Sequence, residues 1–282
     1  MNAILAPEDC LRAGDPAQAL KLLQDQIRAK PGDAKLRVFL FQLLCVLGQW
    51  ERALNQLNVA TELDASTLAM AQTYREAIKC ELLRAEVFRG TKVPMIFGHP
   101  EPWLALLIEA LLREGKGEHA DAKKLRDQAF EQAPAISGTL GDQAFEWIAD
   151  ADMRLGPVIE AVINGKYYWV PFARLSELTI EAPEDLRDAA WMPAHFVFEN
   201  GGDSVGLIPT RYVGSESAGD GLLALARKTD WQESLPGFYT GLGQRIFTTN
   251  EGDFPLMDLR TISFNAAPSD AADAADAANA AE

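Results

Sequence analysis

The chain has few of the residues that build metal centres and redox sites. Its 282 residues include three cysteines and three histidines. Cys10, Cys45 and Cys80 lie far apart in segments predicted to be helical, whereas a zinc site or a redox pair needs two cysteines at close spacing. We therefore expect buried, reduced thiols, as in a cytosolic protein, with no metal and no cofactor.

Long apolar runs and common catalytic motifs are also missing. The longest apolar run, Trp103 to Leu112, is interrupted by Glu109 and is shorter than the about 20 residues that a membrane-spanning helix needs. The N-terminus has no basic stretch followed by an apolar core, so no signal peptide is expected. No Walker loop, H-E-x-x-H or G-x-S-x-G motif occurs. We expect a cytoplasmic protein without membrane insertion, and nothing here favours an enzyme.

Basic residues are scarce relative to acidic ones. The chain has 26 Lys and Arg against 41 Asp and Glu, which gives a formal net charge of −15. Such a field repels phosphate backbones, so nucleic acid is a poor partner. A basic or amphipathic peptide is a better one.

What the sequence does contain is an internal repeat. Positions in the first 60 residues recur at an offset of 34, which is the period of the tetratricopeptide helix-turn-helix repeat. In that repeat a glycine lets the chain turn between two antiparallel helices, and a small alanine lets the helices approach each other. The recurring pairs are Gly14 and Gly48, Ala19 and Ala53, Leu20 and Leu54, and Leu23 and Leu57.

A third copy of the repeat is predicted around residues 103–134. Gly117 and Pro134 lie 103 residues after Gly14 and Pro31, which leaves room for a degenerate fourth unit between the second and third copies. The prolines stand where the second helix of a unit must end. Residues 34–47 are apolar on several sides and should be central to the stack. A closing helix is expected over 139–153, with Asp142, Asp150 and Asp152 facing water.

After Gly156 the pattern changes from helical to extended. Val158–Ile163 and Lys166–Val170 flank Asn164-Gly165, a strong hairpin signal. A second hairpin is predicted from His195–Phe198 and Ser204–Ile208. The fold class is therefore α+β and multidomain: a tetratricopeptide-like helical superhelix over 1–156, then a smaller, mostly antiparallel β-rich domain over 157–265. Residues 266–282 form an Ala/Asp-rich tail that we expect to be disordered.

The predicted groove of the helical stack is the first candidate site. Repeat geometry places one set of side chains near its concave face, where an amphipathic helix could seat its apolar stripe while acidic residues at the rim meet basic ones. Each leucine in this set could equally belong to the core. The partner-binding candidates are Val38, Gln42, Leu104, Leu107 and Leu111.

A second candidate lies in the β-rich part. His195 begins a strand near Asp203 across a hairpin, which would suit a hydrolase or a ligand-sensing domain with the helical half as a targeting arm. Gly241-Leu-Gly243 resembles part of a dinucleotide loop but lacks the third glycine and the strand-loop-helix context. The glycines between Glu199 and Asp203 are explained by a turn alone.

Several long blocks, in one order, resemble the ImpE/TagJ family of accessory proteins of bacterial type VI secretion systems. Only the Ala/Asp-rich tail falls outside the resemblance. The blocks are LRVFLFQLLCVLG (36–48), WERAL (50–54), WIADAD (147–152), GKYYWVP (165–171), NGGDSVGLIPTRY (200–212) and GQR (243–245).

The resemblance implies a cytoplasmic, non-enzymatic adaptor. In that family the expected partner is the N-terminal helix of the small subunit of the contractile sheath, so the protein would influence sheath assembly or its recycling by the associated AAA+ unfoldase. The family supplies no residue-level binding motif, so the groove residues remain a prediction from repeat geometry.

Overall fold

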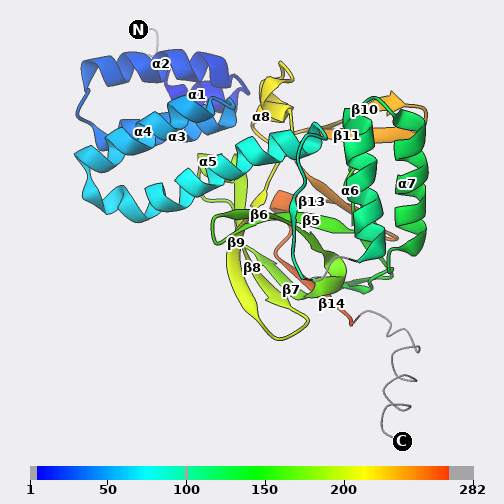
Figure 1. Cartoon of the computed structure of the whole chain (residues 1–282). Coiled ribbons are helices and arrows are strands. Elements are labelled where there is room, and N and C mark those ends of the chain that lie inside the picture. The colour runs from blue at the N-terminus through cyan, green and yellow to red at the C-terminus, as the bar shows by residue number, and fades with distance from the viewer. Residues whose placement is uncertain (1–4, 99–100, 267–282) are drawn as a thin grey trace, which may run out of the picture.

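The computed structural model describes residues 5–98 and 101–266 and begins with a stack of antiparallel helices (Figure 1). Gly14 and Gly48 take positive φ values of 80° and 65° in the turns between helices, and Ala19 and Ala53 are fully buried where the helices cross. The predicted repeat units are confirmed. The helices of the stack are α1 (Pro7–Arg12), α2 (Pro16–Ala29), α3 (Ala34–Val46), α4 (Trp50–Leu63) and α5 (Leu68–Phe88).

Helix α5 replaces the degenerate unit expected between the second and third helix pairs. It is a single helix of 21 residues that runs from the stack to the sheet. After it the chain turns at Gly90 and becomes extended, and strand β1 (Met95–Ile96) pairs in parallel with strand β6 (Lys166–Pro171). The expectation of a fourth helix pair is therefore wrong. The segment that follows α5 is extended and includes strand β1, so α5 has no partner helix of its own in this interval.

Helices α6 (Pro102–Gly115) and α7 (His119–Gln132) form the predicted third pair. The C-terminal end of α6 lies against the end of α5, where Gly90 and Gly115 meet. A Cβ added at Gly115 would lie 2.8 Å from the Cα of Gly90 and would overlap the carbonyl oxygen of Arg89. Only glycine lets these two chain segments approach so closely.

The closing helix expected over 139–153 is wrong, because this segment forms three short strands: β2 (Gly138–Leu140), β3 (Gln143–Phe145) and β4 (Ile148–Asp150). Gly138 explains part of the difference, since a side chain there would strike the backbone oxygen of Ser263 on the neighbouring strand. Apart from the two-residue strand β1, strand structure thus begins at residue 138, before the predicted change of domain at residue 157.

The main sheet has nine strands in the order β1-β6-β5-β9-β8-β7-β14-β2-β3, and the β1–β6 pair is its one parallel pairing within the described residues. Both predicted hairpins are confirmed, with Asn164 and Gly165 at positive φ in the first. The remaining strands of this sheet are β5 (Val158–Ile163), β6 (Lys166–Pro171), β7 (Leu175–Ile180), β8 (Trp191–Phe198), β9 (Asp203–Pro209) and β14 (Thr261–Phe264).

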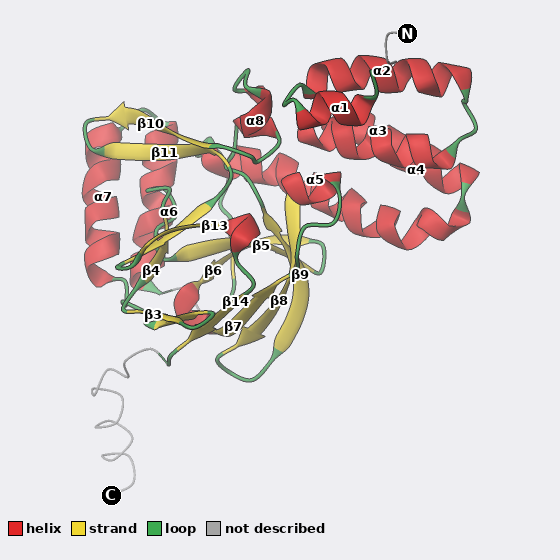
Figure 2. Cartoon of the chain, turned by 180° about the vertical axis from the view of Figure 1, so that it is seen from behind, coloured by secondary structure: helices red, strands yellow, loops and turns green. Residues whose placement is uncertain are grey.

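Two smaller sheets and one short helix complete the described fold. Strands β10 (Thr229–Leu235) and β11 (Phe238–Gly243) form a hairpin, and β12 (Ile246–Thr249) lies between β13 (Gly252–Pro255) and β4. Helix α8 (Gly221–Ala224) lies between the hairpin and the stack in Figure 2. The tail predicted to be disordered covers residues 266–282, and all of it after residue 266 lies outside the described part of the chain.

Two apolar cores lie on the two faces of the main sheet. One includes Trp169, Trp191 and Leu207 and is shared with the helices. The other includes Phe196 of β8 and Phe247 of β12, so the small β13-β12-β4 sheet covers that face. The helical stack and the sheet therefore share one continuous core.

The contact between Gly90 and Gly115 gives the first testable prediction. Gly115→Ala should lower the free energy of unfolding by about 1–3 kcal/mol, because the added methyl group has no room. Gly32→Ala is the control: outside the two neighbouring residues, no heavy atom lies within 4 Å of a Cβ at that position. Urea unfolding followed by circular dichroism measures both variants, and equal stabilities would contradict the close packing described here.

Candidate functional site

The structure separates the predicted partner-binding residues into two groups. Leu104, Leu107 and Leu111 on α6 are 0%, 1% and 3% exposed and belong to the shared core. The expectation that they line an open groove is therefore wrong, because the molecule's own side chains cover them. Val38 and Gln42 on α3 are partly exposed, and their role in binding stays a prediction.

Part of the stack is covered by the β-rich half of the chain. The ring of Tyr74 on α5 lies 5.8 Å from that of Phe41 on α3 and 5.6 Å from that of Trp191 on β8. The guanidinium of Arg187, from the short helical turn Leu186–Ala189, lies 4.9 Å from the centre of the Tyr74 ring. This side of α3 and α5 is therefore occupied by the chain itself.

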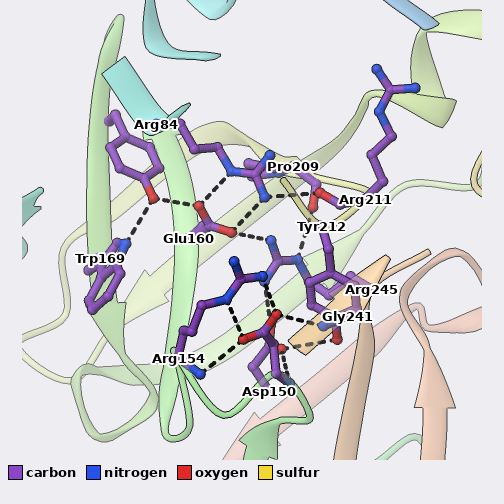
Figure 3. Close-up of polar contacts among 12 residues, drawn as sticks. Arg84, Asp150, Arg154, Glu160, Trp169, Pro209, Arg211, Tyr212, Gly241 and Arg245 are labelled. Carbon is purple, nitrogen blue, oxygen red and sulfur yellow. Dashed lines mark hydrogen bonds and ion pairs between the residues drawn. The ribbon is translucent and has the colours of Figure 1, made fainter. Parts of the chain in front are cut away.

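A buried polar network joins α5 to the sheet, with Glu160 of β5 at its centre (Figure 3). The carboxylate of Glu160 accepts two hydrogen bonds from Arg84 of α5, at 2.6 Å from Nε and 2.9 Å from Nη2. It also accepts hydrogen bonds from the Tyr167 hydroxyl and from Arg245. Trp169 Nε1 donates to the same hydroxyl at 2.8 Å. A buried charge of this kind is tolerated only when its oxygens are fully paired.

The network continues from Arg245 to the loop after β4. Arg245 donates to Asp150 and to the carbonyl oxygen of Pro209, the latter at 2.9 Å. Asp150 also accepts from the Tyr212 hydroxyl at 3.1 Å and from the backbone N–H of Asp152 at 2.9 Å. Asp150 and Asp152 are 3% and 0% exposed, so the expectation that they face water is wrong.

A third buried arginine of this region fixes the end of α3. Arg211, 3% exposed, donates to the carbonyl oxygens of Val46 at 2.6 Å and Cys45 at 2.7 Å, and also to that of Ala224. The last carbonyls of a helix have no partner within it and carry partial negative charge. Arg211 supplies a donor to both carbonyls, in addition to the Gly48 N–H that already bonds to Cys45, and it also supplies a compensating charge. It thereby attaches the repeat stack to the segment that follows β9.

The two central carboxylates have opposite pKa shifts. Burial opposes the ionisation of Glu160, but the charges of Arg84 and Arg245 outweigh it and lower its pKa to about 2. For Asp150 burial is the larger effect, Arg245 offsets only part of it, and the pKa rises to about 7. Perturbed carboxylates often mark an active site, but here their oxygens are occupied by neighbouring donors, which indicates a structural role.

Sequence reasoning missed this network, although two signals were available. Arg84 falls on the buried side of α5, in register with Ala77, Cys80 and Val87, where an arginine requires a partner. Several other members fall inside the blocks that carry the family resemblance: Asp150, Asp152, Tyr167, Trp169, Arg211, Tyr212 and Arg245.

The His195–Asp203 pair exists but lies in the open. His195 Nε2 is 2.8 Å from Asp203 Oδ2, and the two side chains are 41% and 66% exposed. The nearby groove between α5 and β9 is lined by other side chains. A hydrolytic site usually encloses its substrate and excludes water, so this exposed pair gives the hydrolase alternative little support.

The described residues form neither a metal cluster nor a membrane-spanning helix. Within 5–98 and 101–266, no group of three or more His, Cys, Asp or Glu side chains is placed to hold a metal ion. Over the same ranges, no helix combines the length and the apolar character needed to cross a bilayer. Gly241 lies in strand β11 and donates its N–H to Asp152, so it belongs to no nucleotide loop.

Comparisons with known proteins agree with both halves of the fold. Residues 11–77 match a tetratricopeptide repeat and residues 142–263 match the ImpE protein family. The chain is 51% identical over 265 residues to the type VI secretion system accessory component TagJ of Pseudomonas aeruginosa (strain PAO1), covering 94% of this chain and 92% of the relative. A crystal structure of protein VPA1032 from Vibrio parahaemolyticus matches with a TM-score of 0.84 at 28% identity, covering 92% of this chain and 97% of the other.

The fold thus places the chain among two-part α+β proteins in which a tetratricopeptide-like stack precedes a β-rich unit. With this identity over almost its whole length, the chain belongs to the ImpE/TagJ family of type VI secretion accessory components.

Coupling between Arg84 and Glu160 is the second testable prediction. Arg84→Met and Glu160→Met should each lower the free energy of unfolding by about 3–5 kcal/mol, because each leaves a buried charge without its main partner. The double variant should cost clearly less than the sum of the two. The exposed Glu76–Lys79 pair on the same helix serves as the control and should couple by less than about 1 kcal/mol. Additive losses at Arg84 and Glu160 would contradict the network.

The low pKa of Glu160 gives a third prediction, on pH. Since the folded pKa is about 2 and the ordinary value is 4.5, its ionisation stabilises the fold fully above pH 4.5. This stabilisation is lost as the pH falls from 4.5 towards 2. The melting temperatures of the wild type and Glu160→Gln should therefore differ most near pH 6 and approach each other as the pH falls from 4.5 towards 2. A difference that stays constant over this range would show that Glu160 is not ionised in the fold.

Proposed function

We propose that this protein is a non-enzymatic, cytoplasmic adaptor of a type VI secretion system that binds the N-terminal helix of the small sheath subunit. By holding that helix it would modulate sheath assembly, or sheath recycling through an indirect effect on the AAA+ unfoldase. It needs no cofactor, no nucleic acid and no membrane insertion for this role. The single observation that carries the proposal is the 51% identity to a type VI secretion accessory component over 94% of the chain.

The architecture suits an adaptor. Stacked helical repeats present extended surfaces to partner segments, and an amphipathic helix is a common ligand of such surfaces. The perturbed carboxylates of this chain are used to join its two halves. The described residues thus offer surfaces for contact, and the buried polar groups are engaged with each other.

The negative charge of the chain lies outside the repeat stack. Residues 5–90, which hold the repeat stack, contain eleven acidic and eleven basic side chains, so the net charge of −15 comes from the rest of the chain. An acidic rim on the stack is therefore a poor explanation for attraction of a basic helix. The attraction would arise from the β-rich half and its surroundings.

Co-purification with the small sheath subunit of the same organism is the fourth prediction. The full-length subunit should be retained on the immobilised protein, and a subunit lacking its first helix should be lost, because the helix supplies the contact. Val38→Glu, changed at a partly exposed position of α3, tests whether the predicted groove residues take part. Equal retention of the full-length and truncated subunits would refute the proposed partner segment.

A further inference from the structure

Helices cover only part of one face of the main sheet. Val162 of β5 and Leu207 of β9 lie in the core shared with Ala71 and Tyr74 of α5. Two residues before Leu207 in β9, on the same face, Val205 is 74% exposed. In Figure 1 the lower parts of β7 and β8 lie below α5 and away from the α6–α7 pair. Helix α5 therefore leaves the continuation of this face open.

The strand register defines this open face. Opposed residues in neighbouring strands point to the same side of a sheet, so one row crosses four strands and a second row runs beside it. These outward positions alternate with buried ones such as Phe196 and Leu178. The first row is Val205, His195, Thr179 and Thr261, and the second is Asp203, Val197, Glu177 and Ser263.

A groove runs along the border between α5 and the open face. It has a volume of about 340 Å³. Gln72, Thr73 and Glu76 of α5 form one wall, and Val205 and Leu207 contribute to the other. A segment lying on the open face would thus meet α5 along its side, as a neighbouring helix in a layer does.

The charge of the open face has one sign. Its eight positions include the carboxylates Glu177 and Asp203 and contain no lysine or arginine. The one basic group, His195, is already paired with Asp203. Glu76 at the groove is a further carboxylate, and Lys79 on the same helix is paired with it. The apolar contribution comes from Val197, Val205 and the threonine methyl groups.

We infer that this open face, together with the groove beside α5, is a docking surface for an amphipathic helix with an apolar stripe flanked by basic side chains. The apolar stripe covers Val205 and Val197, and the basic residues meet Glu177 and Asp203. The charge complementarity selects a basic partner, and the width of four strands suits a helix lying next to α5. The inference rests on the proposed function for the partner's identity but locates it away from the groove of the repeat stack.

Binding of two labelled peptides, followed by fluorescence anisotropy with the full chain, tests this surface. The first peptide is the first helix of the small sheath subunit, and the second is a model amphipathic helix of equal length with leucine on one face and lysine on the other. Val205→Lys should weaken binding at least tenfold, since it removes apolar contact and repels basic groups. Val93→Lys is the matched control, because Val93 is 55% exposed on the connector before β1 and the net charge changes equally. Affinity should also fall as salt is raised.

The outcomes separate the surface from the proposed function. If Val205→Lys loses the binding of both peptides and Val93→Lys keeps it, the docking surface and the proposed function are both supported. If the sheath helix binds wild type and Val205→Lys equally, the surface is wrong while the function stands. If the wild type binds only the model helix, and Val205→Lys does not bind it, the docking surface is supported and the proposed partner is refuted. If neither peptide binds the wild type, both are overturned. Unchanged melting temperatures of the two variants confirm that each is folded.

Discussion

The fold depends on the neutralisation of one buried carboxylate. Glu160 lies in the middle of a sheet strand, and it is held in charged form by arginines that come from a repeat helix and from the segment before β12. Removing water from three charges costs several kcal/mol for each ion, which is recovered only when every donor is correctly placed. The network therefore specifies one arrangement of the helical and β-rich halves, where apolar packing alone would tolerate small shifts.

The same requirement explains why the two halves share a core. Arg84 reaches Glu160 only because α5 lies directly on the sheet, and Arg211 reaches the end of α3 only because the chain after β9 passes beneath the stack. As a consequence of these contacts, one side of the repeat stack is covered. Residues that a free-standing repeat would offer to a ligand are packed against Trp191 and its neighbours, and the free surface is displaced towards the sheet.

Much of the helical half could be predicted from the sequence, because its signals are local. Glycine and alanine recur at the repeat period, and Asn164-Gly165 marks a hairpin without reference to the rest of the chain. The strands over 138–150 could not be predicted, since they are short and owe their structure to distant partners such as Ser263 and Thr248. Leu104, Leu107 and Leu111 illustrate the same limit: helical periodicity identifies a face and leaves open what covers it. The expectation that Asp150 faces water fails for the same reason, because its partner Arg245 lies 95 residues away in the sequence.

Helix α5 belongs to both halves, and this has a mechanical consequence. Its 21 residues correspond to a rod of about 30 Å, with one end packed in the repeats and the other bonded into the sheet. No flexible tether intervenes between these ends. A force applied to the repeats would be transmitted along this helix to the strands. The molecule would therefore respond to a pulling force as one rigid body and not as two flexibly linked domains.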